Sequence, residues 1–392
     1  MRQVTRSSPQ QLSVSATLDL QSVERELSEL WKQNTGATDV EEDGAVMRAR
    51  VLNLMVYVAV EEALEEVNEL LGEISSAHPC RVIIMFAGRE EADQDIEMFV
   101  SAHCVSSSGA GGKNLCGEQV TLKARGRFAV ELPSAAVPLL VPDLPVFLWW
   151  RDAPRLDDQT FSTLTRASDR VIIDSVAFRR PYDDVLALVA LLGRRKREQA
   201  AISDLNWARL TGWRTLLASF YDVEEYRAAL SLINHVRIEY VPHDNAPEAI
   251  AAKALILAGW LASRLGWSIA PAQSLMKNGE GAQEVAAEKD GRQILIEFAA
   301  VERRAEMQGW IARIELSAEA SASPSKFVVL RSKDGRYLET QVSGAGETLS
   351  SRALLGGDKS EAELLACELE IISHDRIYEE AISVAARMLG AK

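Results

Sequence analysis

The chain has 392 residues, 47% of them hydrophobic, and a formal net charge of −14. This length predicts two domains with substantial cores. The acidic balance argues against a general nucleic-acid-binding protein, which would present a basic surface, and against binding to anionic membranes. Four scattered cysteines do not form a disulfide scaffold, no apolar run is long enough to span a bilayer, and the first 20 residues lack a signal-peptide core. We therefore expect a cytoplasmic protein.

The beginning of the chain predicts a polar extension followed by an α/β domain. Residues 1–44 form the extension, in which a helix capped by Asp19 shows apolar residues at helical spacing. A strand-like run at 48–60, a helical pattern at 61–75 and a buried strand at 81–87 then form a βαβ unit. Because the two strands of such a unit run in the same direction, a mostly parallel or mixed sheet with flanking helices is expected.

Two further strands, at 96–105 and 118–127, flank a glycine-rich loop. The loop runs from Ser106 to Asn114 and includes Lys113. It lacks the Ser or Thr that follows the lysine of a P-loop, and a strand rather than a helix comes after it. A flexible hairpin loop is therefore the better interpretation.

Cys104 and Cys116 would lie on these neighbouring strands, at the two ends of the loop. Cysteines on opposed strands can come within disulfide range, so one interpretation is a reversible thiol pair. The other interpretation is two separate thiols. His103 lies beside Cys104, but structural zinc sites normally need four ligands, and these three residues are weak support for one.

Residues 132–152 combine four prolines with an apolar run that ends in two tryptophans. Because proline removes a backbone donor and restricts φ, the stretch cannot be one long helix. It predicts a short helix at 134–140, a proline-bounded turn and a buried strand at 145–150. Adjacent strand residues point to opposite faces, so Trp149 and Trp150 each need an apolar partner or a place in an interface. If both are buried, this stretch belongs to the scaffold and a partner-binding site lies elsewhere.

The predicted bounds of the α/β domain are 45–221. A helix at 156–167, a strand at 170–175 and helices at 182–197 and 204–221 complete it. The third of these four elements ends in a run of basic residues, which suits the negative end of the helix dipole and is also a candidate docking site.

The remaining residues, 222–392, predict an α+β domain with an antiparallel sheet of about five strands. A strand at 232–241 and a helix at 246–265 come first. Asp290-Gly291 and Asp334-Gly335 each lie between strand-like runs, which is the signature of a type I′ hairpin. Two helices close the chain.

The residue patterns contain no catalytic or metal-binding set. The five histidines are spread out without metal-type pairing, and there is neither a nucleophile elbow nor a dinucleotide-binding glycine motif after a strand. The sequence therefore predicts no cofactor, no metal ion and no catalytic residue. Eight tryptophans without a catalytic set suit a binding protein better than an enzyme, since aromatic side chains dominate interface energetics.

Five motifs in a fixed order carry a resemblance to a known family. They are HPCR at 78–81, LPVFLWWRDAP at 144–154, DRVIIDS at 169–175, DLNWARLTGWR at 204–214 and GWLASRLGW at 259–267. With these motifs, the chain resembles the OpcA family, the glucose-6-phosphate dehydrogenase assembly proteins. The resemblance implies a non-catalytic protein that binds glucose-6-phosphate dehydrogenase as an assembly factor and allosteric activator. It would promote the active oligomer or raise the affinity for substrate, and so support the oxidative pentose phosphate pathway and its supply of NADPH.

The resemblance does not indicate the docking face. Basic edges and exposed loops of an acidic protein are accessible to a partner, so we take them as candidates. The partner-binding candidates are Arg151, Arg179, Arg180, Arg194, Arg195, Arg197 and Lys113.

Two other functions stay open at this point. The first is a sugar-phosphate-binding enzyme or sensor with a site at the carboxyl ends of the first sheet, where Arg151, Arg179 and Arg180 would bind the phosphate. The second is an inert scaffold whose acidic surface keeps it in solution.

Overall fold

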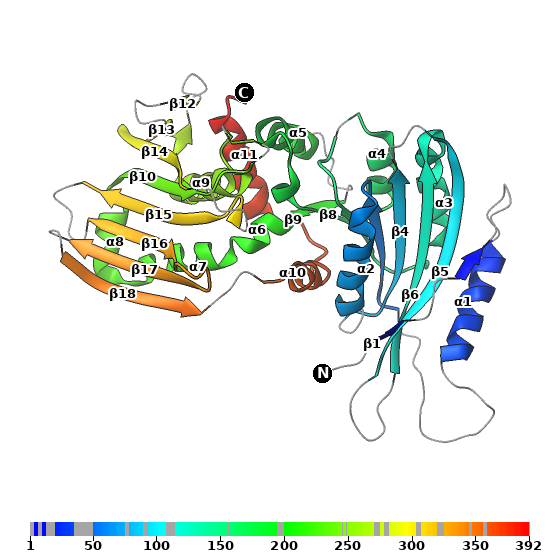
Figure 1. Cartoon of the computed structure of the whole chain (residues 1–392). Helices are drawn as coiled ribbons and strands as arrows, with labels where there is room; N and C mark the ends of the chain where they lie inside the picture. Colours follow the sequence, from blue (N-terminus) through cyan, green and yellow to red (C-terminus); the bar gives the residue numbers. More distant parts are fainter. Residues whose placement is uncertain are drawn as a thin grey trace. The chain divides into compact units, whose positions relative to one another are not determined.

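The computed structural model of the chain consists of two compact units, each assembled from three separate segments (Figure 1). Because the segments alternate, the units do not follow a single cut in the sequence. The domain boundaries predicted after residues 44 and 221 stay a prediction. The structure describes all residues except 1–3, 7–9, 13–19, 35–49, 75–77, 89–91, 107–113, 156, 194–199, 245, 248, 270–274, 278–281, 303–306, 320–324, 345–346, 356–358 and 392.

The first unit comprises residues 1–173, 196–203 and 360–374 and holds a nine-stranded mixed sheet. Its strands are β1 (Val4–Arg6), β2 (Gln10–Leu12), β3 (Leu52–Val58), β4 (Cys80–Gly88), β5 (Gln94–Ser106), β6 (Asn114–Arg125), β7 (Val146–Trp150), β8 (Arg170–Ile173) and β9 (Ala201–Asp204). Their order across the sheet is β1-β5-β6-β4-β3-β7-β8-β9, with β2 also paired to β5. Strands β6, β4, β3, β7 and β8 are parallel, whereas β5 is antiparallel to β6. The predicted mixed sheet is confirmed.

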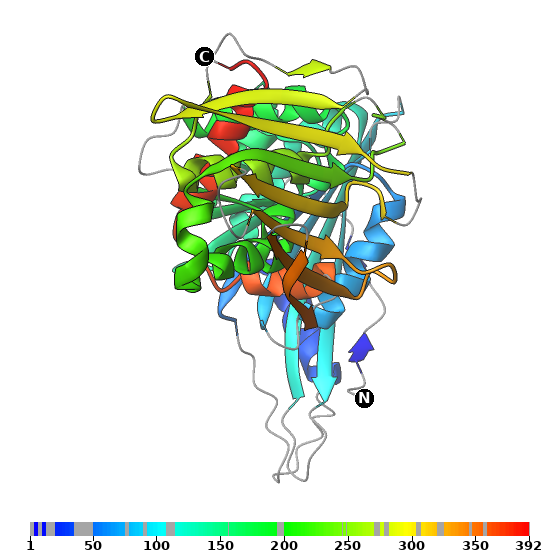
Figure 2. The same ribbon diagram turned by 90° about the vertical axis from the view of Figure 1, so that its left-hand side faces the viewer.

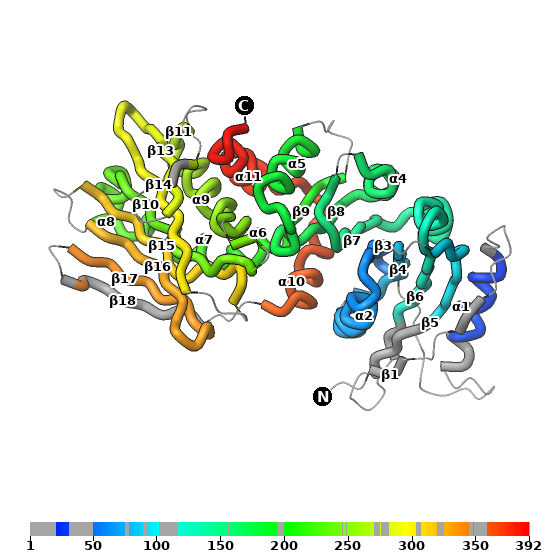
Figure 3. The backbone as a smooth tube through the Cα atoms, turned by 45° about the horizontal axis from the view of Figure 1, so that its top comes forward, coloured from blue at the N-terminus to red at the C-terminus, as the bar shows by residue number. Residues whose placement is uncertain are grey.

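Among the described residues, five α-helices belong to this unit. They are α1 (Leu20–Asn34), α2 (Glu62–Ile74), α3 (Leu132–Ala136), α4 (Gln159–Arg166) and α10 (Glu361–Glu368). The predicted βαβ unit is β3-α2-β4, in which Leu52 pairs with Cys80 in parallel register and α2 buries Leu64, Val67 and Leu71. Helix α10 comes from near the end of the chain and packs on α2 (Figure 3).

The proline-rich stretch forms the predicted short helix, as α3, and the predicted strand, as β7. Trp149 and Trp150 are 0% and 1% exposed, so both belong to the scaffold. Trp150 stacks on Tyr57 with ring centroids 3.9 Å apart. The turn before β7 is held by Asn53, whose amide nitrogen donates to the Val141 carbonyl at 2.9 Å and whose amide oxygen accepts from the Val141 nitrogen at 2.8 Å.

The second unit comprises residues 174–195, 204–359 and 375–392 and holds another nine-stranded sheet. Its strands are β10 (Ile233–Tyr240), β11 (Ser268–Ile269), β12 (Met276–Lys277), β13 (Gln283–Lys289), β14 (Arg292–Ala300), β15 (Ile311–Ala318), β16 (Lys326–Arg331), β17 (Tyr337–Gly344) and β18 (Glu347–Leu355). The order is β11-β13-β14-β10-β15-β16-β17-β18, with β12 also paired to β13.

The prediction of about five antiparallel strands is therefore wrong in number and in pairing. In the described ranges, seven strands of this sheet are longer than two residues, and β11 and β12 are too short to leave a sequence pattern. Strand β10 inserts between β14 and β15, parallel to the first and antiparallel to the second. A helical segment separates β10 from the strands that follow it in sequence, and such a connection permits parallel pairing.

One of the two predicted type I′ turns is present. Asp290 and Gly291 have φ values of 52° and 77° between β13 and β14, as that turn requires. At the second pair only Gly335 has a positive φ, of 74°, and five residues separate β16 from β17. The hairpin forms, but the predicted turn type is wrong. The connection is a longer loop, which Ser332 closes by accepting a hydrogen bond from the Tyr337 nitrogen at 3.0 Å.

Six α-helices complete the second unit within the part of the chain that the structure describes. They are α5 (Pro181–Gly193), α6 (Leu205–Arg209), α7 (Thr211–Ser219), α8 (Glu224–Leu230), α9 (Ala252–Leu265) and α11 (Arg376–Met388). Figure 2 shows the sheet in front of its helices, which lie against one face. The single helix predicted at 204–221 is divided at Leu210 into α6 and α7. Within the described part of the chain, no helix combines the length and apolarity needed to cross a membrane.

Helices α9 and α11 pack unusually closely. A Cβ atom at Gly259 of α9 would lie 2.1 Å from the carbonyl oxygen of Ala381 in α11. Glycine is therefore required at this position, since any side chain would separate the helices. Helix α9 ends at Gly266, which adopts the left-handed conformation with φ 68°, as its place after an apolar helix predicts.

Candidate functional site

The structure places Arg151 in a paired, largely buried position. It follows β7, its guanidinium lies 3.0 Å from a carboxylate oxygen of Glu66 in α2, and it lies 3.1 Å from one of Glu361 in α10. The side chain is 16% exposed and its guanidinium carbon lies 4.7 Å from the ring centroid of Trp149. Arg151 thus links two helices of the first unit.

The other predicted docking residues are not brought together with Arg151 by the described structure. Arg179 and Arg180 are exposed in the second unit, ahead of α5, and Arg180 pairs with Asp183 at 3.4 Å. Four candidates, Arg194, Arg195, Arg197 and Lys113, lie outside the described residues.

The cysteines differ in their surroundings. The backbone register of β5 and β6 places Cys104 directly opposite Cys116, as the loop between them predicts; their side chains lie outside what is described. Cys80 is buried, and desolvation raises the pKa of its thiol to about 12, which leaves it protonated and unreactive at neutral pH. Cys367 is exposed on α10.

A buried polar network occupies the helical side of the second unit. Its centre is Asp204, which is 0% exposed and caps the start of α6. One carboxylate oxygen accepts hydrogen bonds from the backbone nitrogens of Ser175 at 3.0 Å and Asn206 at 2.9 Å. The other accepts from the hydroxyl of Tyr378 in α11 at 3.2 Å. Three distant parts of the sequence therefore meet at one carboxylate.

The pKa of Asp204 is raised to about 6, first by desolvation and then by repulsion from Asp174. The hydrogen bonds from Ser175 and Asn206 oppose this rise. Asp174 itself forms a two-pronged ion pair with Arg209, with distances of 2.7 and 2.8 Å. The network can therefore take up one proton near pH 6, at a position enclosed by protein.

The same network anchors the start of α11. The indole nitrogen of Trp207 donates to the carboxylate of Asp375 at 2.7 Å, and Asp375 caps α11 by accepting from the Tyr378 nitrogen at 3.0 Å. Helix α6, which carries the DLNWAR motif, thus fixes α11 at two points. Sequence reasoning missed this link, because residues 207 and 375 are far apart in the chain and no local pattern connects them.

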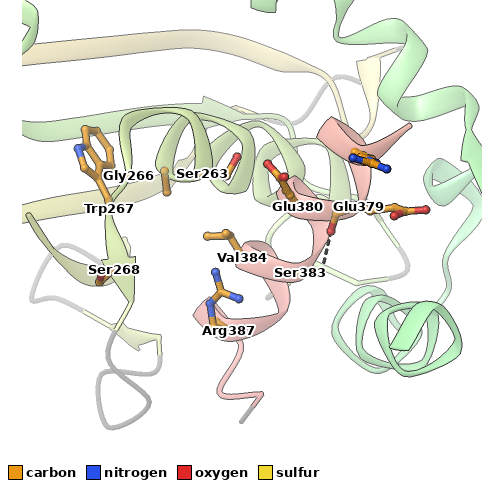
Figure 4. Close-up of a pocket in the computed structure, with 11 residues that line it drawn as sticks. Ser263, Gly266, Trp267, Ser268, Glu379, Glu380, Ser383, Val384 and Arg387 are labelled. Atoms are coloured by element: carbon orange, nitrogen blue, oxygen red, sulfur yellow. Dashed lines mark hydrogen bonds between the residues drawn. The ribbon is translucent and has the colours of Figure 1, made fainter. Parts of the chain in front are cut away.

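Helix α11 forms one wall of a groove of about 630 Å³ (Figure 4). The opposite wall is the last turn of α9 and the residues that follow it. Hydroxyl, indole and guanidinium groups line the groove, among them Ser263, Trp267, Ser268, Arg376, Ser383 and Arg387. All of these belong to the second unit.

Some charged groups around the groove form an ion pair, and others do not. Glu380 of α11 forms an ion pair with Arg264 of α9. In contrast, the guanidinium groups of Arg376 and Arg387 have neither an ion pair nor a hydrogen bond with any residue that the structure describes. Both are exposed at the mouth of the groove. The groove can therefore offer two cationic groups to a ligand.

These features define a class of two-unit protein in which motif residues build the scaffold and an open groove remains on the surface. Within the described residues, no three histidine, cysteine or carboxylate side chains converge as metal ligands would. Comparison with protein families matches residues 72–190 to the "Glucose-6-phosphate dehydrogenase subunit N-terminal domain" and residues 200–382 to the corresponding C-terminal domain. The chain belongs to the OpcA family, which confirms the resemblance drawn from its motifs.

Two curated relatives show the extent of this likeness. The chain is 30% identical over 322 residues to the OxPP cycle protein OpcA of Nostoc punctiforme, covering 81% of this chain and 66% of that protein. It is 32% identical over 195 residues to OpcA of Synechocystis, covering 50% of this chain and 39% of that protein. The chain thus spans less than two thirds of the length of either relative.

Two solved structures match the chain at low similarity. Glucose-6-phosphate dehydrogenase in complex with glucose 6-phosphate matches with a TM-score of 0.48 and 8% identity, over 88% of this chain and 92% of that chain. An oxidoreductase from Sinorhizobium meliloti matches with a TM-score of 0.44 and 12% identity, over 86% of each chain.

Proposed function

We propose that this protein is a non-catalytic partner of glucose-6-phosphate dehydrogenase that binds the enzyme and promotes its active oligomer. The family match over residues 72–190 and 200–382, to domains described as parts of a glucose-6-phosphate dehydrogenase subunit, carries this proposal. The burial of the motif residues supports it. Trp149, Trp150 and Asp204 are enclosed as scaffold and present no reactive group to solvent.

Activation by a binding partner has a definite thermodynamic form. A partner that binds the high-affinity state of the enzyme more tightly than the low-affinity state shifts the population toward the former. The apparent substrate KM then falls, and substrate must tighten the protein–protein complex by the same factor. Couplings of this kind are typically about 1–3 kcal/mol, so a KM change of about tenfold is expected.

Titration into the cognate dehydrogenase tests the proposal. Enzyme activity at low substrate and the molar mass of the complex are followed together, with an unrelated acidic protein as the control. We expect a stable complex of larger mass and a lower apparent KM. A dehydrogenase whose mass and activity stay unchanged at micromolar concentrations of this protein would contradict the proposal.

The alternative, a sugar-phosphate site at the carboxyl ends of the first sheet, has less support. It relies on Arg151, Arg179 and Arg180 as phosphate ligands, and the guanidinium of Arg151 is already paired with two carboxylates. A shift of the thermal midpoint by glucose 6-phosphate in the absence of the dehydrogenase would favour this alternative.

A further inference from the structure

The groove between α9 and α11 has the features of a docking site for an anionic chain segment. On a protein with a net charge of −14, unpaired guanidinium groups are not needed for solubility, and most described arginines contact a carboxylate or a carbonyl oxygen. Arg376 and Arg387 are exceptions that border the same groove. We propose that this groove binds an extended acidic segment of the dehydrogenase, an inference that rests on the proposed function.

The spacing of the two arginines determines what can bridge them. They are eleven residues apart on α11, which is close to three full helical turns, so both lie on one stripe of the helix. Their Cα atoms are therefore about 16 Å apart along the axis. An extended segment advances about 3.3 Å per residue and its side chains alternate between two faces, so two carboxylates about four or six residues apart, on one face, would match the two guanidinium groups.

The hydroxyl groups between the arginines suit a peptide backbone. The Ser383 hydroxyl donates to the Glu379 carbonyl at 2.6 Å, and the Ser263 hydroxyl donates to the Trp260 carbonyl at 2.8 Å. Because each hydroxyl proton is engaged, each oxygen can act only as an acceptor, and that of Ser263 also accepts from the Nε of Arg264 at 3.4 Å. An inserted segment supplies backbone N–H donors, which such acceptors can bind.

Two acidic residues also line the groove, but they do not reverse its charge. Glu379 and Glu380 lie between the arginines, and Glu380 is neutralised by Arg264. Counting Arg264, three guanidinium groups face two carboxylates. The charge is therefore positive at the two ends, which favours a ligand with separated acidic groups over a compact one.

A double charge reversal tests the inference. The variant R376E/R387E is compared with R25E/R336E, which changes the net charge equally at two exposed arginines outside the groove. We expect the first variant to bind the dehydrogenase at least about tenfold more weakly, or about 1.4 kcal/mol, and the second within about twofold of the wild type. Both variants should retain the wild-type thermal midpoint, since none of the four arginines is buried.

The two proposals fail in different ways. If the wild type does not bind the dehydrogenase, the proposed function is contradicted. If the wild type binds and both variants bind equally well, the function stands and the groove is not the docking site. A photocrosslinker at Ser383 gives an independent readout: crosslinks to an acidic stretch of the dehydrogenase support the inference, and crosslinks confined to neutral or basic stretches overturn it.

Discussion

Asp204 is a buried residue of the second unit whose protonation state affects stability. Its folded pKa of about 6 lies above the ordinary 3.8, so the native state binds a proton more tightly than the unfolded chain. The associated stability is fully present below pH 3.8 and is lost as pH rises through about 6. The difference corresponds to about 3 kcal/mol of unfolding free energy.

We therefore predict that Asp204→Asn reduces the fall in unfolding free energy between pH 4 and pH 7. Asparagine keeps an acceptor for the backbone nitrogens of Ser175 and Asn206 but has no charge to desolvate. Urea unfolding at several pH values measures the effect. Asp158→Asn, at the half-buried cap of α4, is the control, and a pH dependence unchanged by Asp204→Asn would contradict the account.

Arg170 is the second residue with a specific prediction. It is 2% exposed in β8, and its guanidinium donates to Glu368 and to the Ser373 carbonyl, each at 2.6 Å. Removing one partner of a buried ion pair leaves the other charge unpaired, at a cost of about 3–5 kcal/mol. We expect Arg170→Ala to lose that much unfolding free energy and Arg166→Ala, on an exposed helix end, to lose little. A loss below 1 kcal/mol at Arg170 in urea unfolding would be inconsistent with its role.

At the scale of elements, the close packing of α9 on α11 supports the groove. Gly259→Ala gains about 1 kcal/mol of helix propensity, but its Cβ would lie 2.1 Å from the Ala381 carbonyl oxygen. We expect a net loss of about 1–3 kcal/mol, measured by thermal or urea unfolding, and weaker binding to the dehydrogenase.

Gly72→Ala is the matched control for this substitution. Gly72 lies in α2, and a Cβ built there meets nothing within 4 Å. The control should therefore be neutral or up to about 1 kcal/mol more stable. If the two substitutions change the unfolding free energy equally, α9 and α11 do not need their close contact at Gly259, which contradicts this account.

The hairpin of β5 and β6 carries Cys104 and Cys116, for which the sequence leaves open a reversible thiol pair or two separate thiols. Because Cys104 and Cys116 are opposite each other in register, mild oxidation with diamide should join them in a disulfide, with the two thiol hydrogens passing to diamide, which is reduced to the hydrazine. Intact mass and thiol titration measure this, with Cys104→Ser as the control. Two thiols that remain titratable after oxidation would favour separate cysteines.

Local sequence patterns predicted a helix or strand correctly where its apolar residues alone determine that it forms. The β3-α2-β4 unit and β7 follow from runs of apolar residues that both faces of a sheet require. The division at Leu210 was not predictable, because the pattern stays helical across it and tertiary packing decides the break. The parallel pairing of β10 was missed for a similar reason: strand neighbours are chosen by the whole sheet.

At the scale of the whole molecule, the family could be predicted from the sequence, but the groove could not. The order of five motifs was sufficient to predict the OpcA family, since their residues are local in sequence. The groove was not predictable, because its walls come from α9 and α11, which lie more than 100 residues apart. The meeting of Asp204 with Tyr378 across 174 residues is another contact that only the folded chain reveals.

The central claim is that this protein binds glucose-6-phosphate dehydrogenase and is coupled to its substrate. The most direct test is the Kd of the complex, measured by calorimetry with and without glucose 6-phosphate. The account predicts binding in both cases, and a Kd lowered by substrate by the same factor as the protein lowers the substrate dissociation constant. Absence of binding at micromolar concentrations, with and without substrate, would contradict it.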